Sequence, residues 1–218
     1  MPASEPTEVG TEPTSQPVRF RSPFIIVGTA VTSLLFAAHF FNDLFSGTLA
    51  ALLPTLQLRF GVSELTLAVF VACLSFSSSV LQPLFGAVAD RLGRRLVAAA
   101  GVIVTSTFLS LIPVMPSPLL LIPLLLVGGL GSAAFHPAGT ALARQAAKAK
   151  GGLALGIFSA GGTMGMAFGP LVIGLFIING WLDYSPVLMI PGVILGLLIY
   201  LLLPPQPRSQ DGSHTRLF

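Results

Sequence analysis

Long apolar stretches separated by short polar connections dominate the chain. Six of them approach or exceed the roughly 20 residues that a helix needs to cross the hydrocarbon core of a bilayer. Because a lipid-embedded backbone must satisfy its own hydrogen bonds, each stretch is predicted to be a transmembrane α-helix. The six predicted helices cover residues 24–54, 65–88, 96–115, 119–142, 152–178 and 186–203.

The composition agrees with this pattern. The 218 residues are 53% hydrophobic and 9% charged, and their mean hydropathy is +0.88. Soluble domains have about 25% charged residues, so the sequence predicts an integral, multi-pass protein of the cell (inner or plasma) membrane. The single cysteine, Cys73, lies within an apolar stretch, which excludes a disulfide framework.

The basic residues are distributed unequally between the two ends of the predicted helices. Ten of the eleven Lys and Arg fall on one side of the membrane, and only Arg59 falls on the other. The positive-inside rule places that basic side, with both termini, in the cytoplasm. Topology therefore explains the pI of about 9.6, and nucleic-acid binding is excluded. The first and second sets of three helices then run in opposite senses, as two inverted three-helix repeats require.

The two ends of the chain are polar. Residues 1–21 are rich in Pro, Glu, Ser and Thr and are predicted to be a disordered cytoplasmic tail. No signal peptide is predicted, because the first apolar stretch is too long and five more follow it. We expect a six-helix transmembrane domain at 22–204 and a polar cytoplasmic tail, or a truncated linker, at 205–218.

The first predicted helix contains an acidic residue near its middle. Asp43 follows His39 by one helical turn, and residues 39, 42 and 43 share a helical face. A charged residue at that depth costs about 2.5–3.5 kcal/mol on insertion scales, which favours a proton- or substrate-handling role. The alternative is a protonated Asp43 that packs by hydrogen bonding. His136 lies at a comparable depth in the fourth helix, so the two histidines could meet near a cavity between the repeats.

The connection after the second helix matches the pattern G-x-x-x-D-R-x-G-R-R. Glycine allows helices to approach closely or the chain to turn tightly, the aspartate can balance an arginine, and the arginines hold the loop in the cytoplasm. This pattern resembles the loop between the second and third helices of the major facilitator superfamily. The residues are Gly86, Asp90, Arg91, Gly93, Arg94 and Arg95.

The fifth predicted helix carries several glycines and a Gly-Pro pair. They resemble the glycine and proline motif of antiporters of that superfamily, which implies export. A proline frees a backbone carbonyl and can kink the helix, whereas glycines permit close packing. Packing alone is the alternative explanation. The motif residues are Gly156, Gly165, Gly169 and Pro170.

The first and fourth helices together resemble the fosmidomycin resistance branch of the superfamily. That branch has a similar His-x-x-Asn-Asp in its first helix, here His39 to Asp43, and Phe-His-Pro in its fourth, here around His136. The resemblance covers about residues 34–178. It implies a membrane protein that exchanges protons for a drug or small organic metabolite, and hence drug resistance. Two departures are Ala138, often acidic in that branch, and Leu125, near which other proton antiporters have an arginine.

The second departure, the absence of an arginine near Leu125, assigns proton coupling to Asp43, His39 and His136. Desolvation favours the neutral forms of both residue types, so both can exchange protons. Our hypothesis is that Asp43 is the proton site, that His39 modulates it, and that His136 meets substrate or proton from across the cavity; a packing role is the alternative for His136. The residues expected to line the substrate cavity are Asn42, Gln82, Ser132 and Ser75, although Ser and Gln also join helices by hydrogen bonds.

Other function classes fit less well. An intramembrane serine protease needs G-x-S-G and a histidine in the sixth helix, but Ser132 is followed by Ala133 and that helix has no histidine. A metal enzyme built on His39, Asp43 and His136 is possible by ligand type, but none of the three has a dedicated ligand spacing. No enzyme, metal or cofactor is therefore predicted.

The sequence resembles only one half of a complete transporter, which has two six-helix halves. The chain could therefore be a truncated product, half of a split transporter or a subunit that pairs with itself. We expect a second six-helix half as partner. A non-transporting relic or a scaffold subunit is the alternative function.

Overall fold

The computed structural model describes residues 23–146 and 151–205, and the regular structure within these ranges is helical. The predicted tail at 1–21 lies outside the described residues. The predicted tail at 205–218 does so too, except for residue 205. The elements are α1 Pro23–Phe60, α2 Glu64–Ser75, η1 Phe76–Val80, α3 Gln82–Leu92, α4 Arg94–Ser110, η2 Ile112–Val114, α5 Pro118–Ala146, α6 Gly151–Ile178, η4 Leu182–Leu188 and α7 Met189–Leu202.

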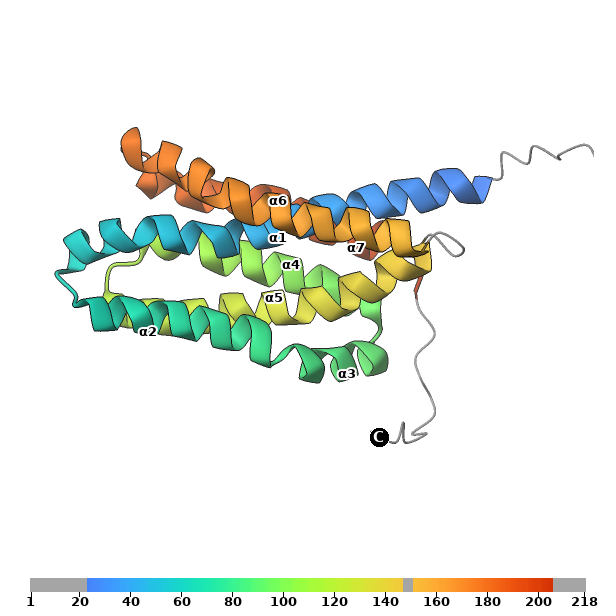
Figure 1. The fold of residues 1–218 in the computed structure, drawn as a ribbon, viewed down its shortest axis with the longest axis horizontal. Coiled ribbons are helices and arrows are strands. Elements are labelled where there is room, and N and C mark those ends of the chain that lie inside the picture. Colours follow the sequence, from blue (N-terminus) through green and yellow to red (C-terminus); the bar gives the residue numbers. More distant parts are fainter. Residues whose placement is uncertain (1–22, 147–150, 206–218) are drawn as a thin grey trace, which may run out of the picture.

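The long helices run side by side in one bundle (Figure 1). The most extensive contact is between α1 and α6, followed by α4 with α5, and α7 packs mainly on α4. Among the described residues, four helical segments are long and apolar enough to cross a membrane, and α2, η1 and α3 together would form a fifth. A sixth span within α1 stays a prediction. The four segments are Arg94–Val114, Pro118–Ala146, Gly152–Ile178 and Leu182–Leu202.

The predicted continuous helix over 65–88 is wrong in one respect, because the chain bends by 45° between η1 and α3. A π-helical turn, η1, precedes the bend, and Pro83 at the start of α3 has no N–H to donate. Proline and π-turns are the usual causes of sharp helix kinks. The side chain of Gln82 donates to Ser78 O at 3.0 Å and so satisfies one carbonyl near the break.

Three glycines of α6 bring it against α1. They are spaced four residues apart and therefore lie on one face of the helix. A β-carbon at any of them would collide with a backbone carbonyl oxygen of α1, so only glycine permits this approach. The glycines are Gly161, Gly165 and Gly169, and the carbonyls belong in turn to Phe36, Phe40 and Leu44.

Two apolar clusters form the core of the bundle. One contains Leu35 and Ala38 of α1, and the other contains Leu44 and Phe45 of the same helix. The polar residues at 39, 42 and 43 lie on α1 between these two clusters. The packed bundle thus holds a short polar stretch at a fixed place between apolar layers.

Candidate proton-exchange site

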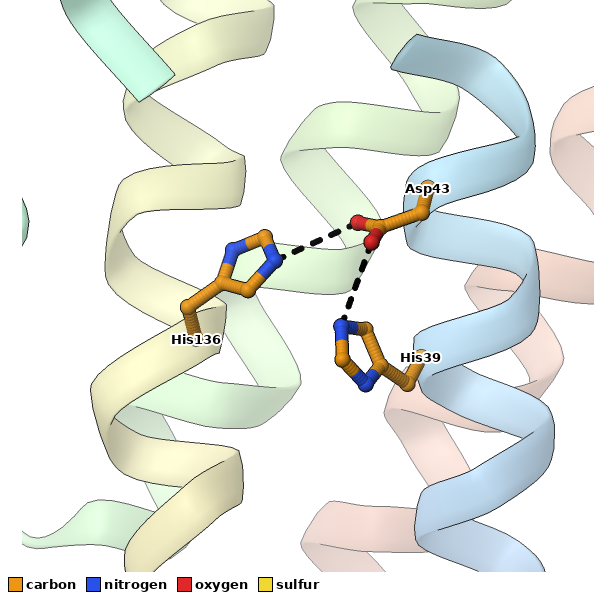
Figure 2. A group of neighbouring side chains, drawn as sticks. All are labelled: His39, Asp43 and His136. Carbon is orange, nitrogen blue, oxygen red and sulfur yellow. Dashed lines mark ion pairs between the residues drawn. The ribbon is translucent and has the colours of Figure 1, made fainter. Parts of the chain in front are cut away.

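Asp43 of α1 lies between two imidazoles (Figure 2). Its Oδ2 is 3.2 Å from His39 Nε2, one turn earlier on α1, and its Oδ1 is 3.3 Å from His136 Nε2 on α5. The two histidine rings meet edge to face with their centroids 5.0 Å apart. The expected meeting of the two histidines is therefore observed. We call these three residues the Asp43 cluster.

Backbone carbonyls orient both imidazoles. His39 Nδ1 lies 2.7 Å from Phe158 O of α6, and the histidine ring stacks on the Phe158 ring with centroids 4.1 Å apart. His136 Nδ1 lies 2.8 Å from Ser132 O, one turn earlier on α5. Because a carbonyl oxygen can only accept, a hydrogen bond at these two contacts requires Nδ1 to donate; Ser132 Oγ also lies 3.3 Å from His136 Nδ1, and each Nε2 is turned toward Asp43.

Asn42 and Ser132 support the cluster from within the protein. Asn42 Nδ2 donates to Asp43 Oδ1 at 2.9 Å and to Ser132 Oγ at 3.0 Å. Both residues are buried, so in this arrangement they hold Asp43 in place rather than line an open cavity. A role for either in a substrate cavity stays a prediction.

A groove of about 630 Å³ opens beside the cluster, between α3, α5 and the start of α4. The side chain of His136 is 25% exposed and that of Asp43 is 14% exposed, so His136 links the groove to the partly buried carboxylate. Of the predicted cavity residues, Gln82 lines this groove, whereas Ser75 is exposed on α2 and does not. The lining residues include no acidic side chain; they are Gln82, Arg94, His136, Pro137, Thr140, Ala141, Arg144 and Gln145.

The predicted turn between α3 and α4 is present. Arg94 donates to Asp90 Oδ1 at 2.9 Å, which confirms the expected charge balance. Gly93 has a φ of 100°, in the left-handed region that favours glycine, which confirms its place in a tight turn. A β-carbon at Gly86 would lie 3.8 Å from Pro137 Cβ, an ordinary contact, so close packing within the described residues does not require this glycine.

Arg95 has a structural contact that the sequence did not indicate. Its Nη1 donates to Leu203 O at 2.9 Å, and its guanidinium carbon lies 4.8 Å from the centre of the Tyr200 ring. Arg95 therefore joins the start of α4 to the end of α7. Arg91, in the same motif, is exposed.

The glycine and proline motif of α6 divides into two parts. Gly165 and Gly169 pack against α1, whereas a β-carbon at Gly156 would meet no atom within 4 Å, so close packing within the described residues does not explain that glycine. Pro170 leaves Met166 O without its usual helical donor, and this carbonyl faces α1. α6 nevertheless continues through the proline to Ile178.

Gly162 is a site residue that sequence reasoning missed. A β-carbon on Gly162 would collide with His39 Nε2 and would lie 2.6 Å from Asp43 Oδ2. The backbone of α6 thus closes one side of the Asp43 cluster. The signal in the sequence is the doublet Gly161-Gly162, in which one glycine meets the α1 backbone and the next meets its side chains.

The chemistry of the cluster favours proton exchange. Two imidazoles and a carboxylate are groups that exchange protons readily, and each Nε2 lies within ion-pair distance of a carboxylate oxygen. The same three residues are the one compact group of potential metal-binding side chains among the described residues, with their ligand atoms within 4.8 Å of one another.

Comparison with known proteins gives a consistent result. The family model for the Major Facilitator Superfamily matches residues 35–217. The uncharacterized MFS-type transporter YfnC of Bacillus subtilis is 30% identical over 69% of this chain and 38% of its own length. The fosmidomycin resistance protein of Escherichia coli is 29% identical over 72% of this chain and 37% of its own length. YwoD of B. subtilis, another uncharacterized MFS-type transporter, is 26% identical over 79% of this chain and 38% of its own length.

The family model matches most of the chain. The chain itself spans only 37–38% of the lengths of these three relatives. The apolar helices and the family agree on a multi-pass membrane protein. The proteins of this family are transporters rather than enzymes. The chain belongs to the Major Facilitator Superfamily.

Proposed function

We propose that the chain is one six-helix half of a secondary transporter that exports a small organic compound in exchange for protons. In this proposal six helices cross the inner or plasma membrane as two inverted three-helix repeats, with both termini in the cytoplasm. Substrate and proton pass through a cavity completed by a second six-helix half, either a separate region or chain or a second copy of this one.

The Asp43 cluster is the observation that carries this proposal. A carboxylate within an apolar helix costs free energy, and a bundle that only packs has no need of one. Here the carboxylate contacts two imidazoles, and one of these reaches a groove that opens at the protein surface. A proton can therefore pass between the groove and Asp43 through His136, which is what proton coupling requires.

The groove supports a role in handling a substrate. It is large enough for a small organic molecule and is lined by amide, hydroxyl, imidazole and guanidinium groups. It lies beside His136, so a bound compound and a proton would be close neighbours. Such proximity lets each influence the binding of the other, which is the basis of coupled exchange.

Fosmidomycin is the compound to test first, because one relative is named a fosmidomycin resistance protein. The chain is reconstituted in vesicles alone and together with a second six-helix half. Uptake of labelled fosmidomycin is then measured in inside-out vesicles with an imposed proton gradient and after an ionophore has dissipated it. We expect gradient-dependent accumulation in at least one of these preparations.

Asp43→Asn is the decisive variant, because it keeps the size of the side chain and removes the exchangeable proton. Accumulation should lose its dependence on the proton gradient. Asp183→Asn is the matched control, since Asp183 is exposed in η4. If Asp43→Asn retains full gradient-driven uptake, the proposed coupling site is wrong. If no preparation accumulates fosmidomycin, the alternative of a non-transporting scaffold subunit is favoured.

A further inference from the structure

The contacts of the Asp43 cluster define how many protons it holds. Each histidine uses its Nδ1 hydrogen for a backbone carbonyl, that of Phe158 for His39 and that of Ser132 for His136. In a neutral imidazole only one nitrogen carries a hydrogen, so both Nε2 atoms would then be acceptors. They would face the oxygens of Asp43, which in the ionised form are also acceptors.

Two short acceptor–acceptor contacts in a buried place are unfavourable, and one proton relieves only one of them. The contact from His39 is 3.2 Å and that from His136 is 3.3 Å, and they involve different oxygens of Asp43. A single proton on either Nε2 or on the carboxylate can bridge one contact only. At the other contact, the lone pair of an unprotonated Nε2 then faces a carboxylate oxygen with no hydrogen between them.

The position of His39 makes this counting strict. His39 is 94% buried, because its relative exposure is 6%, and its Nε2 has no hydrogen-bond partner among the described residues; the Asp43 carboxylate faces it at 3.2 Å as an ion-pair partner. The ring cannot turn to present Nε2 elsewhere without giving up the bond from Nδ1 to Phe158 O and its stacking on the Phe158 ring. A hydrogen at the contact between His39 and Asp43 must therefore be one of the labile protons held by the cluster itself.

Among the described residues, no other ionisable group contacts the cluster. α6 contains no titratable residue, and α5 contributes only His136 and Arg144, which also lines the groove. From α4, Arg94 lines the same groove but is paired with Asp90 of α3. The remaining ionisable residues that the structure describes in α1 and in the elements packed on it make no contact with the cluster; they are Arg59, Glu64, Cys73, Arg95 and Tyr200.

We propose that His39, Asp43 and His136 form a two-proton unit, and that the arrangement in Figure 2 is its doubly protonated state. The two labile protons are on the two Nε2 atoms, so that each imidazolium is an ion-pair partner of the carboxylate, and they give the cluster a net charge of +1. When both protons leave for solvent, each imidazole remains as the Nδ1–H tautomer, Asp43 remains ionised, and the cluster carries −1. The proton count stands on these contacts alone. Its consequence for transport, that two protons are exchanged together, rests on the proposed function.

Nitrogen NMR of the full chain in lipid nanodiscs tests the inference. The chain contains three histidines, so ¹⁵N-histidine labelling gives a simple spectrum, and His214→Gln removes the one outside the described residues. His39→Gln and His136→Gln assign the two remaining rings. Carbon-13 labelling of aspartate, compared with Asp43→Asn, reports protonation of Asp43. The proton count is the sum over both Nε2 atoms and the carboxylate as pH is raised.

The expected result is a loss of two protons per chain, with both neutral imidazoles in the Nδ1–H form. Release of a single proton, or a neutral ring in the Nε2–H form, would overturn the two-proton unit. This readout is independent of transport. A two-proton titration without gradient-driven uptake would leave the inference standing and reject the proposed function, whereas transport with a one-proton titration would do the reverse.

Discussion

The backbone of Gly162 in α6 packs directly against the carboxylate of Asp43 in α1, so that a β-carbon on Gly162 would lie 2.6 Å from Asp43 Oδ2. Gly162→Ala should therefore separate α6 from α1 at the cluster or displace the side chains of His39 and Asp43. We expect a loss of gradient-driven uptake together with a lower thermal stability, since overpacking costs about 1–3 kcal/mol.

Gly174→Ala is the control for that variant. Gly174 lies on the same helix, and a β-carbon there would meet no atom within 4 Å. It should keep both uptake and stability. A Gly162→Ala protein with unchanged uptake and an unchanged ¹⁵N-histidine spectrum would contradict the packing of α6 on the cluster.

The contact between α1 and α6 depends on glycine at four-residue intervals. Gly165→Ala would place a β-carbon against Phe40 O, and the two helices would have to move apart. We expect a destabilisation of about 1–3 kcal/mol, measured as a shift of the unfolding transition in detergent. Gly156→Ala is predicted to remain within about 1 kcal/mol of the original protein, because its position is open. Equal destabilisation by both substitutions would contradict the glycine interface.

The sequence predicted the helices well where a single physical rule decides them. The predicted ranges 119–142 and 152–178 agree closely with α5 Pro118–Ala146 and α6 Gly151–Ile178. An apolar stretch of that length in lipid must form a single helix, because its backbone has to satisfy its own hydrogen bonds. The break before α3 was missed. It arises from a π-turn and a proline acting together, and neither interrupts the apolar pattern.

The site was predictable only in part, for a related reason. His39 and Asp43 share a helical face by their spacing, and the comparable depth of His136 suggested that it would meet them. The partners that orient the imidazoles are the backbone carbonyls of Phe158 and Ser132, and a carbonyl has no residue-type signal. Tertiary packing selects which carbonyl is near, so these contacts appear only in the folded structure.

Arg95 should hold the end of α7 against α4. Its guanidinium donates to Leu203 O and stacks on the Tyr200 ring, whereas a lysine offers a point charge without the planar fork. Arg95→Lys is expected to raise amide hydrogen exchange of the last turn of α7 about five-fold, which corresponds to about 1 kcal/mol. Exposed Arg91, mutated to Lys, is the control and should leave exchange unchanged.

The predicted orientation can be tested across a single helix. Gln145 at the end of α5 and Asn179 after α6 are both exposed, and α6 includes one of the four segments able to cross a membrane. Cysteines placed at these two positions should therefore lie on opposite sides, whatever the total number of spans. Cys73→Ser supplies the background, because the chain has no other cysteine.

A membrane-impermeant maleimide should label Asn179→Cys in intact cells and Gln145→Cys only after permeabilisation. The reason is that the basic residues cluster at the end of the bundle that holds Gln145, and positive charge is retained in the cytoplasm. Neither substitution changes a charge, so the test leaves the cause of the orientation intact. Labelling of Gln145→Cys in intact cells would reverse the orientation, and labelling of both positions would show that α6 does not cross the membrane.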